Sequence, residues 1–480
     1  MVYFEYGEYT MPNFREYNQS QMNFMPIIPS DLLEEEHSSR IIDKVVELLN
    51  IDNIIETYKE EGNPPYNPRM MLKVLFYAYY IGAMSCRKIW DNLKFRADFI
   101  FLSGCQIPDF RTINDFRKRH IELLPDLFSQ IVHLCSQLEM IDFKYLAIDG
   151  QKIKANANFT KSKNKERLEK SLERVKNGLA KLIEKEINED FPEEVKKKRE
   201  KKLKIQKKHL EELQIELEKR NEEKATINLT DKDAVVMKHK DGRSMPSYNH
   251  VSAVDGKYGI TVAVDTKDDL DCPDDLFSLV EKSKENTGEN EIENVVADPA
   301  FADYSTLEKM ETMAENFLIP DTRFAITESG ESCKGKYDKS NFTIDENGEL
   351  ICPEGKELHL KGTTKFDDGH SLRVFECLCG KDCINHSKCS KAEKRTVSID
   401  SREKFREKMR EKLRSDKGRE IYMKRQGIVE SGHGNDQKNK GWTQHNLRGL
   451  AKATLEFILV RIGSNLGKIV KYKGKELLAM

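Results

Sequence analysis

The feature that most constrains the fold is a short apolar run that ends in an acid. Residues 143–148 are apolar and aromatic enough to form a buried strand, and Asp149 follows them directly. We expect the strand to end there, because Gly150 can begin a turn of small residues. Lysines and amides continue to Asn158. A carboxylate here suits a divalent metal and the lysines and amides suit phosphate, although an ordinary surface acid in a turn has the same pattern.

Two further acids could complete a metal site with Asp149. Asp298 follows the apolar residues 295–297, and Glu430 precedes a basic segment that contains glycines. Three carboxylates on separate elements are what a two-metal phosphoryl-transfer site needs, with the metals roughly 3.5–4 Å apart. Glu456, on a later apolar helix, is a rival for the third position. Because the chain has 82 acidic residues, spacing alone does not select these acids.

Composition indicates an intracellular protein of several parts. The length of 480 residues predicts about three domains, and a hydrophobic fraction of 38% still allows a sizeable core. Charged residues make up 34% of the chain but nearly cancel to a net charge of -2, so any basic surface must be local. We find no apolar run long enough for a transmembrane helix and expect no secretory signal in residues 1–17. The ten cysteines are expected to be thiols or metal ligands.

The N-terminal third is predicted to be helical. We expect a loosely held arm over residues 1–30 and an all-helical domain over residues 31–140. Helix starts are indicated at Asn67, at about Ser85 and at Asp109. The helix after Asp109 is basic, which is typical of helix-turn-helix DNA recognition and equally of a charged surface helix. Its basic residues are Arg111, Arg117, Lys118 and Arg119.

Residues 160–225 are strongly charged and carry leucines at a coiled-coil spacing. The pattern breaks at residues 190–192, which include a proline, and then resumes. We therefore predict an inserted antiparallel helical hairpin. The lysine-rich run at residues 196–202 could contact phosphates, but a solvated helix face is favoured.

Residues 245–300 alternate apolar and polar positions, which predicts a hairpin of strands with a turn at Asp255-Gly256. A helix from about Asp275 to Lys284 should lead to the strand before Asp298. Pattern alone indicates an α/β or α+β fold. After Glu430, a long apolar helix is predicted from about Leu447 to Ile469.

Five cysteines gather in residues 340–395. Four thiolates could bind Zn²⁺ and hold together a loop-rich insert with little core of its own, although a cysteine-rich insert without metal remains open. The predicted ligands are Cys352, Cys379, Cys383 and Cys389, with Cys377 as an alternative.

The three acidic segments together resemble the DDE transposases of bacterial insertion sequences, in the subgroup with a helical N-terminal domain and a cysteine-bearing insertion. Asp149 stands in the Asp-Gly-x-Lys-Ile-x-Ala-Asn-Ala sequence of that family, and Asp298 in its Ala-Asp sequence. Glu430 follows Tyr422 and Arg425 as the family glutamate does. The resemblance spans roughly residues 60 to 470, and further family-like stretches are 228–234, 247–249, 253–255 and 446–450.

The resemblance implies a mixed α/β fold built on an RNase H-like catalytic core. The first part of the core would be residues 141–159 and 226–320, interrupted by the hairpin at 160–225. A cysteine-rich, zinc-binding insertion would occupy residues 321–400, and residues 401–480 would be the C-terminal helical part of the core.

The resemblance also implies a function. Asp149, Asp298 and Glu430 would hold Mg²⁺ or Mn²⁺ and catalyse the cutting of double-stranded DNA at the terminal inverted repeats and strand transfer to target DNA. The helical N-terminal domain would bind the element ends, and a homodimer would form on DNA in the nucleoid of the bacterial cytoplasm. Residues expected to contact the DNA are Tyr422, Arg425, Lys438, Lys152, Lys154 and the arginines 111, 117 and 119.

The chain departs from the family pattern at several positions. Ala300 and Phe301 stand where the family has Gly and Tyr, and His433 stands where it has Phe. Gln437 occupies the usual position of a Lys, and Lys438 follows one step later. These departures motivate one alternative, a decayed or repurposed relative that binds DNA without cutting it. A nuclease of the same fold and a structural protein are two further alternatives.

Overall fold

The computed structural model describes most of the chain after the predicted N-terminal arm. The described residues are 28–58, 64–185, 193–219, 225–267, 275–321, 324, 336–345, 348–367 and 369–479. Within the helices a few side chains are also left out, and that of Glu430 is one of them. The arm predicted at residues 1–30 and the hairpin turn predicted at 190–192 lie almost wholly outside the described residues.

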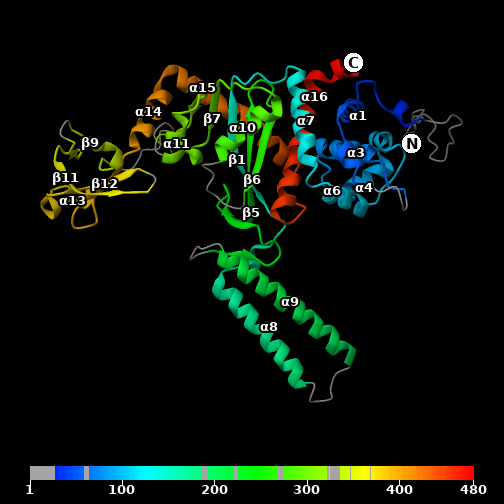
Figure 1. The fold of residues 1–480 in the computed structure, drawn as a ribbon, viewed down its shortest axis with the longest axis horizontal. Coiled ribbons are helices and arrows are strands. Elements are labelled where there is room, and N and C mark those ends of the chain that lie inside the picture. The colour runs from blue at the N-terminus through cyan, green and yellow to red at the C-terminus, as the bar shows by residue number, and fades with distance from the viewer. Residues whose placement is uncertain are drawn as a thin grey trace, which may run out of the picture.

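A mixed six-stranded sheet forms the centre of the molecule (Figure 1). Its strand order is β4-β5-β1-β7-β8, with β6 also paired to β5. The strands β1, β5 and β6 are antiparallel, whereas β7 and β8 continue the sheet parallel to β1. The bounds are β1 Leu146–Lys154, β4 Val235–Lys238, β5 Ser244–Asp255, β6 Thr261–Lys267, β7 Asn294–Ala297 and β8 Asn316–Leu318. The prediction of a mixed α/β fold is therefore confirmed.

The strand that carries Asp149 is longer than predicted. We expected a turn at Gly150, but β1 continues to Lys154 because every residue from Asp149 to Lys154 pairs with β5. The twelve-residue partner strand offers backbone donors and acceptors along this whole length, which outweighs the turn tendency of glycine. Asp149 thus projects from the middle of a strand.

The hairpin that follows agrees with the sequence pattern. β5 ends at Asp255, the chain turns at Gly256, and β6 begins at Thr261. Helix α10, Asp275–Thr287, then leads to β7, as predicted.

Helices cover the sheet and join it to the N-terminal region. Helix α15, Asp416–Gly434, packs against β1 and β7, and α16, Leu450–Ala479, packs against β6 and against α1, α3 and α7. The approach of α16 to α3 requires Gly463, because an added Cβ would lie 2.6 Å from the backbone carbon of Tyr79. The N-terminal helices therefore share one hydrophobic core with the sheet.

The described part of residues 31–140 contains helices without strands, as expected. Asn67 caps α3 and Asp109 caps α6, which confirms these helix starts. The bounds are α1 Ser38–Leu48, α2 Asp52–Ile55, α3 Pro68–Tyr80, α4 Cys86–Phe95, α5 Ala97–Ser103, α6 Phe110–Arg119 and α7 Leu124–Gln137.

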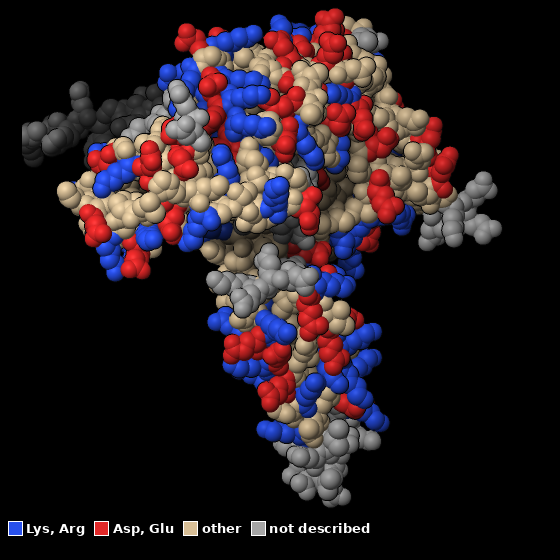
Figure 2. Space-filling model, turned by 60° about the vertical axis from the view of Figure 1, so that its left-hand side comes forward, with Lys and Arg blue, Asp and Glu red and all other residues tan. Residues whose placement is uncertain are grey.

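The inserted hairpin consists of α8, Lys165–Lys185, and α9, Glu193–Lys219, and it projects from the core (Figure 1). The short strands β2, Ser162–Lys163, and β3, Ile227–Asn228, close its base. Leucines line the contact between the helices. Acidic and basic side chains alternate over its visible face (Figure 2), and some of its lysines pair with glutamates. The charges therefore fit a solvated face, which is the favoured reading of its lysine-rich run.

The cysteine-rich insertion is a second sheet with its own core, which corrects the prediction of a loop-rich segment. Five strands pair in the order β13-β12-β11-β10-β9, and Phe342, Leu350 and Phe375 are buried between them and their connections. Alternating apolar positions in short strands supply this core. The prediction had relied on the cysteines and not on this alternation. The bounds are β9 Thr343–Ile344, β10 Leu350–Ile351, β11 Glu357–Lys365, β12 Ser371–Cys377, α13 His386–Cys389 and β13 Thr396–Asp400.

Two further helices lie between this insertion and the central sheet (Figure 1), and a π-helical turn lies at the end of α15. They are the helices α11 Tyr304–Met310 and α14 Glu403–Arg414, and a π-helical turn at Asn435–Asn439.

Candidate active site

Asp149 and Asp298 come from neighbouring parallel strands. Ile148 of β1 pairs with Ala297 of β7, and each acid follows its paired residue by one position. The two carboxylates therefore start from adjacent points of the sheet. Asp298 also accepts a hydrogen bond from the backbone N–H of Ala300, which holds the short turn after β7.

One guanidinium joins the two acids. Arg425, on α15, places one terminal nitrogen 3.3 Å from Asp149 Oδ1 and the other 3.9 Å from Asp298 Oδ2. Tyr422 lies one helical turn earlier, with its ring 5.8 Å from the guanidinium carbon of Arg425. The structure thus brings together Asp149, Asp298, Tyr422 and Arg425, which the sequence had singled out in three separate segments.

His433 is the fifth member of this cluster. Its Nδ1 lies 3.5 Å from Asp149 Oδ2, and its Nε2 lies 3.4 Å from the hydroxyl of Ser252 on β5. Burial lowers the pKa of His433 well below its ordinary value, and the cations Arg461 and Lys240 act in the same direction. A neutral ring can donate from Nδ1 to Asp149 and accept from Ser252.

The environment of Asp149 disfavours a bare carboxylate. Only 17% of its side chain is exposed. Burial raises the pKa of Asp149, and Asp298 adds to that rise, whereas Arg425 and Lys240 oppose it. Asp298 is 40% exposed, so the pair opens to solvent on its side. A cation held between the two acids would remove their repulsion.

Glu430 lies on α15, between Arg425 and His433 in the sequence. Its side chain lies outside the described residues, so the third carboxylate has no position relative to the first two. Among the described side chains, no group of three His, Cys, Asp or Glu residues could hold a metal ion.

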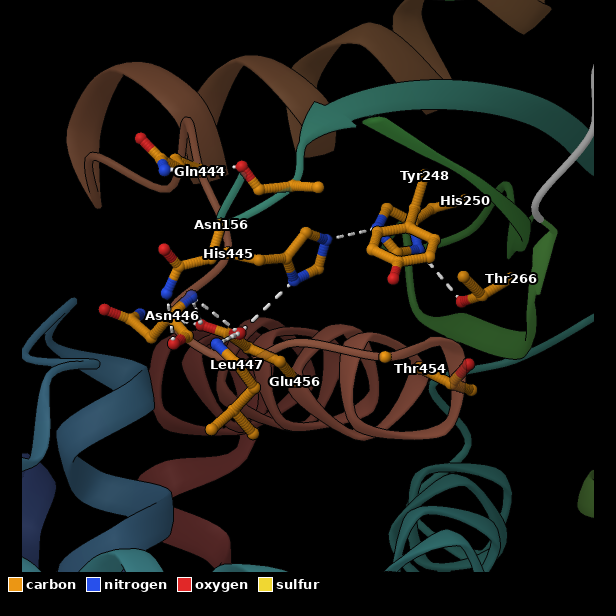
Figure 3. Close-up of polar contacts among 12 residues, drawn as sticks. Asn156, Tyr248, His250, Thr266, Gln444, His445, Asn446, Leu447, Thr454 and Glu456 are labelled. Carbon is orange, nitrogen blue, oxygen red and sulfur yellow. Dashed lines mark hydrogen bonds and ion pairs between the residues drawn. The ribbon is translucent and has the colours of Figure 1, made fainter. Parts of the chain in front are cut away.

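The rival acid Glu456 is committed to a structural network. It is fully buried on α16 and accepts hydrogen bonds from the backbone N–H groups of Asn446 and Leu447 and from the side chain of Asn446 (Figure 3). His445 Nδ1 lies 3.2 Å from the same carboxylate. Burial acts to raise the pKa of Glu456, but the hydrogen bond from His445 and the other donors outweigh it, so that the pKa is lowered. Glu456 anchors the loop before α16.

Two buried histidines extend that network into the sheet. His250 Nε2 lies 2.8 Å from His445 Nε2, and its Nδ1 lies 2.9 Å from the hydroxyl of Thr266 (Figure 3). Donation from Thr266 to His250, then to His445 and then to Glu456 gives every group a partner.

Three of the family-like stretches that had no predicted role, 228–234, 247–249 and 446–450, meet at the start of α16. Asp231 accepts from the hydroxyl of Tyr248 and from the N–H of Gly449, and Asp233 accepts from the N–H of Leu450. These contacts tie three distant segments together and fix the helix start.

The other predicted DNA contacts divide into exposed and buried groups. Arg111, Arg119 and Lys438 are exposed, and Lys152 and Lys154 are partly exposed on β1. Arg117 is a correction, because its side chain is buried and donates to the hydroxyl of Tyr79 and to Asn114. The apolar face of α6 carries this arginine inward, so it supports the helix and is not a surface contact.

The four-thiolate zinc site is also corrected. Cys379 forms a disulfide with Cys377, whereas Cys352, Cys383 and Cys389 are free. The sharp turn after β12 brings the sulfurs of Cys377 and Cys379 together. Their disulfide removes Cys379 from the predicted zinc ligands.

Sequence reasoning noted His433 as a departure but gave no role to it or to Ser252. The sequence held a signal, since a polar ring stands where the resembled family has Phe, three residues after Glu430. The strand register that places Ser252 opposite Asp149 was not accessible from the pattern.

Comparison with protein families gives two matches. Residues 351–470 match the family described as Transposase DDE domain, and residues 28–119 match the family described as Transposase domain (DUF772). These two matches support an insertion-sequence DDE transposase. No curated protein and no solved structure matches it.

The family matches carry general implications. A DDE transposase binds DNA, cuts it and transfers strands, and such enzymes use divalent metal ions. The matched ranges include Arg425, Glu430 and His433 but neither Asp149 nor Asp298. None of the helices in the described part of the chain has the length and apolar character needed to cross a membrane.

Proposed function

We propose that this transposase cuts double-stranded DNA at the terminal inverted repeats of its element and joins the freed ends to target DNA, using Asp149, Asp298 and Glu430 with Mg²⁺ or Mn²⁺. The observation that carries the proposal is that Asp149 and Asp298 share the guanidinium of Arg425. Two acids that reach one cation from adjacent strands can also reach a divalent cation, and carboxylate oxygens are ligands that Mg²⁺ and Mn²⁺ prefer.

The RNase H-like assignment is part of the same proposal. A strand, an antiparallel hairpin, a helix and a parallel strand succeed one another from β1 to β7, which supports it. The first acid is on β1 and the second follows β7, so both belong to the centre of the sheet.

The reaction needs no covalent protein intermediate. A water oxygen attacks the phosphorus at the element end, the bond from phosphorus to O3′ breaks, and O3′ takes up a proton. The freed 3′-hydroxyl then loses its proton as its oxygen attacks a target phosphorus, and the target O3′ leaves and takes up a proton. When bound, divalent cations would lower the pKa of the attacking water or 3′-hydroxyl and stabilise the leaving oxygen.

The side chains around the acids would position the DNA. Arg425 can turn from the carboxylates to a phosphate once the acids are neutralised, and its planar group allows a bidentate contact. Tyr422 lies beside it. Lys438 follows the family lysine position by one residue, but it lies in the π-helical turn, which holds one residue more than an α-helical turn. This extra residue supports Lys438 as the replacement for the family lysine.

The test is cleavage of a labelled duplex that carries the flanking inverted repeat, with Mg²⁺ or Mn²⁺. Asp149→Ala, Asp298→Ala and Glu430→Ala should each reduce cleavage at least about a thousandfold, because each removes a metal ligand. DNA binding should persist in all three variants. A variant at Asp149 that still cuts would contradict the assignment.

The second candidate is a relative that binds DNA without cutting it. Ala300 and Gln437 favour it, since both depart from the family pattern. Phe301, by contrast, is buried, so its loss of the family hydroxyl concerns packing. Binding without cleavage by the wild type would favour this candidate.

A further inference from the structure

A cavity of about 930 Å³ lies beside α16. Its other walls are the end of α15 with the π-helical turn, the turn between β5 and β6, and residues at the start of α1 and the end of α3. Its volume is within the usual range for small-molecule sites, roughly 300–1,000 Å³. Glycines at positions 259, 432, 434, 463 and 467 line it, so a ligand can come close to the backbone.

The charged side chains that line this cavity are all cationic within the described part of the chain. They are Lys438, Lys440, Arg461, Lys468 and Lys471. Lys438 and Lys471 are exposed at its edge, whereas the other three are buried or partly buried. We call this feature the cationic cavity.

One buried acid serves two of the inner cations. A terminal nitrogen of Arg461 lies 3.1 Å from Asp436 Oδ2, and the other terminal nitrogen donates to Gln151 Oε1 at 3.1 Å. Lys440 Nζ lies 3.5 Å from Asp436 Oδ1. The Nε of Arg461 is buried and has no hydrogen-bond partner among the described residues. Asp436 therefore compensates only part of the positive charge.

The third inner cation has partners that carry no charge. Lys468 Nζ donates to the carbonyl oxygens of Tyr258 and Gly259, both at 2.9 Å. Burial lowers the pKa of Lys468, Arg461 acts in the same direction, and Asp436 opposes them without an ion pair in the described residues. Gly259 makes this contact possible, because a Cβ there would overlap the ammonium group. The charge of Lys468 is thus left without a nearby counter-charge.

The inner end of the cavity therefore carries excess positive charge. The remaining acid that acts on Arg461 is Asp149, which already has Arg425 and His433 as closer neighbours. A buried cation without a counter-charge is costly, and an oxyanion that accepts hydrogen bonds from several donors would offset that cost.

The depth of these cations selects the size of the anion. The side chain of Lys440 is 9% exposed and that of Arg461 is 2% exposed. The backbone of a rigid duplex cannot follow side chains this far below the surface, whereas a small molecule can enter. Tyr80 and Tyr472 line the same cavity and offer ring surfaces to the rest of such a molecule.

We propose that the cationic cavity binds a small phosphate-bearing molecule, with its phosphate group held among Lys440, Arg461 and Lys468. The site is distinct from the paired acids Asp149 and Asp298, and the proposal does not depend on the transposition chemistry.

The experiment measures binding of inorganic phosphate and of pyrophosphate by calorimetry, in metal-free buffer with sodium chloride added to a constant ionic strength. The variants are Lys468→Met and Lys440→Met, which keep an unbranched apolar side chain and remove the charge. The matched control is Lys475→Met, an exposed lysine on the same helix. Arg425→Gln tests for binding at the catalytic acids. Thermal unfolding without phosphate checks that each variant folds.

The wild type should bind both anions, and pyrophosphate more tightly because it carries more charge. Lys468→Met and Lys440→Met should each weaken binding at least about tenfold, since each removes a charged donor. Lys475→Met and Arg425→Gln should match the wild type. Without phosphate, Lys468→Met should unfold at or above the wild-type temperature, because a cation without a counter-charge is removed. A lysine with a purely structural role would instead be needed for stability.

Three results would overturn the proposal. The first is no binding by the wild type, or equal affinity in Lys468→Met and Lys440→Met. The second is binding lost in Arg425→Gln but kept in both lysine variants, which would place the phosphate at the catalytic acids. The third is displacement of phosphate by a short duplex, which would assign the cavity to DNA. Failure of the proposed function would be seen separately, as DNA cleavage that survives Asp149→Ala.

Discussion

Two carboxylate and histidine clusters lie on the central sheet, and they differ in how completely their acids are satisfied. Glu456 is fully buried and accepts several hydrogen bonds between 2.7 and 3.2 Å from donors in one loop. Asp149 has neighbours at 3.3 and 3.5 Å, and Asp298 reaches the same arginine only at 3.9 Å. A buried acid with all its lone pairs occupied is a structural anchor. A pair of acids with loose partners and access to solvent can exchange those partners for a ligand.

The largest expected effect concerns the saturated cluster. Glu456→Ala should lower the free energy of unfolding by about 3–5 kcal/mol, because it leaves buried donors without an acceptor. Chemical denaturation followed by circular dichroism measures it. Glu456→Gln keeps the side-chain volume and should also destabilise, because an amide N–H would face donors. A variant as stable as the wild type would remove the contrast between the two clusters.

Asp255 is a third buried carboxylate. It tests whether hydrogen bonds from backbone N–H groups are enough to keep a buried acid charged. It accepts from the N–H groups of Phe143 and Lys257, yet burial raises its pKa to about 6. The folded state therefore binds this proton more tightly than the unfolded state does. Stability from the protonated form is complete below the unfolded pKa of about 3.9 and is lost as the pH rises through 6, by roughly 3 kcal/mol.

The measurement is the unfolding free energy of wild type and Asp255→Asn from pH 4 to pH 8. The difference between them should shift in favour of the variant as the pH rises. A difference independent of pH would mean that Asp255 stays charged throughout.

His433 links the loose cluster to β5 and should act as a positioning residue. His433→Phe, which restores the family residue, should weaken Mn²⁺ binding about 10–100-fold, because a neighbour that orients a metal ligand is removed. Calorimetry with Mn²⁺ alone provides a readout independent of cleavage. His433→Gln, which can still donate to Asp149, should recover part of the affinity. Equal affinity in all three proteins would show that the ring only fills space.

The smallest effect is expected at Asp149 in the absence of metal. Asp149→Asn should slightly raise the unfolding free energy at pH 7.5, because a buried charge with a raised pKa is removed beside Asp298. Thermal unfolding in the presence of a chelator measures this gain. A loss of stability would place Asp149 with Glu456 among the anchors and would weaken the contrast.

Local sequence determined much of this molecule. Asn67 and Asp109 capped the helices they were expected to cap, the leucine spacing produced the α8–α9 hairpin, and the turn at Asp255 formed where predicted. Capping, periodicity and turn formation depend on neighbours in the chain, which is why a pattern can predict them. The structure also brings together Asp149, Asp298 and Arg425, which the resemblance had singled out in the sequence.

What only the tertiary structure decided depends on contacts between distant segments. β1 continued past Gly150 because β5 was long enough to pair with it, and Arg117 turned inward because Tyr79 offered a buried partner. Glu456 and Glu430 look alike in the sequence, but Glu456 meets the donors of residues 445–447 and is thereby occupied. The fate of a carboxylate depends on which donors reach it, and the packing of the whole chain sets those distances.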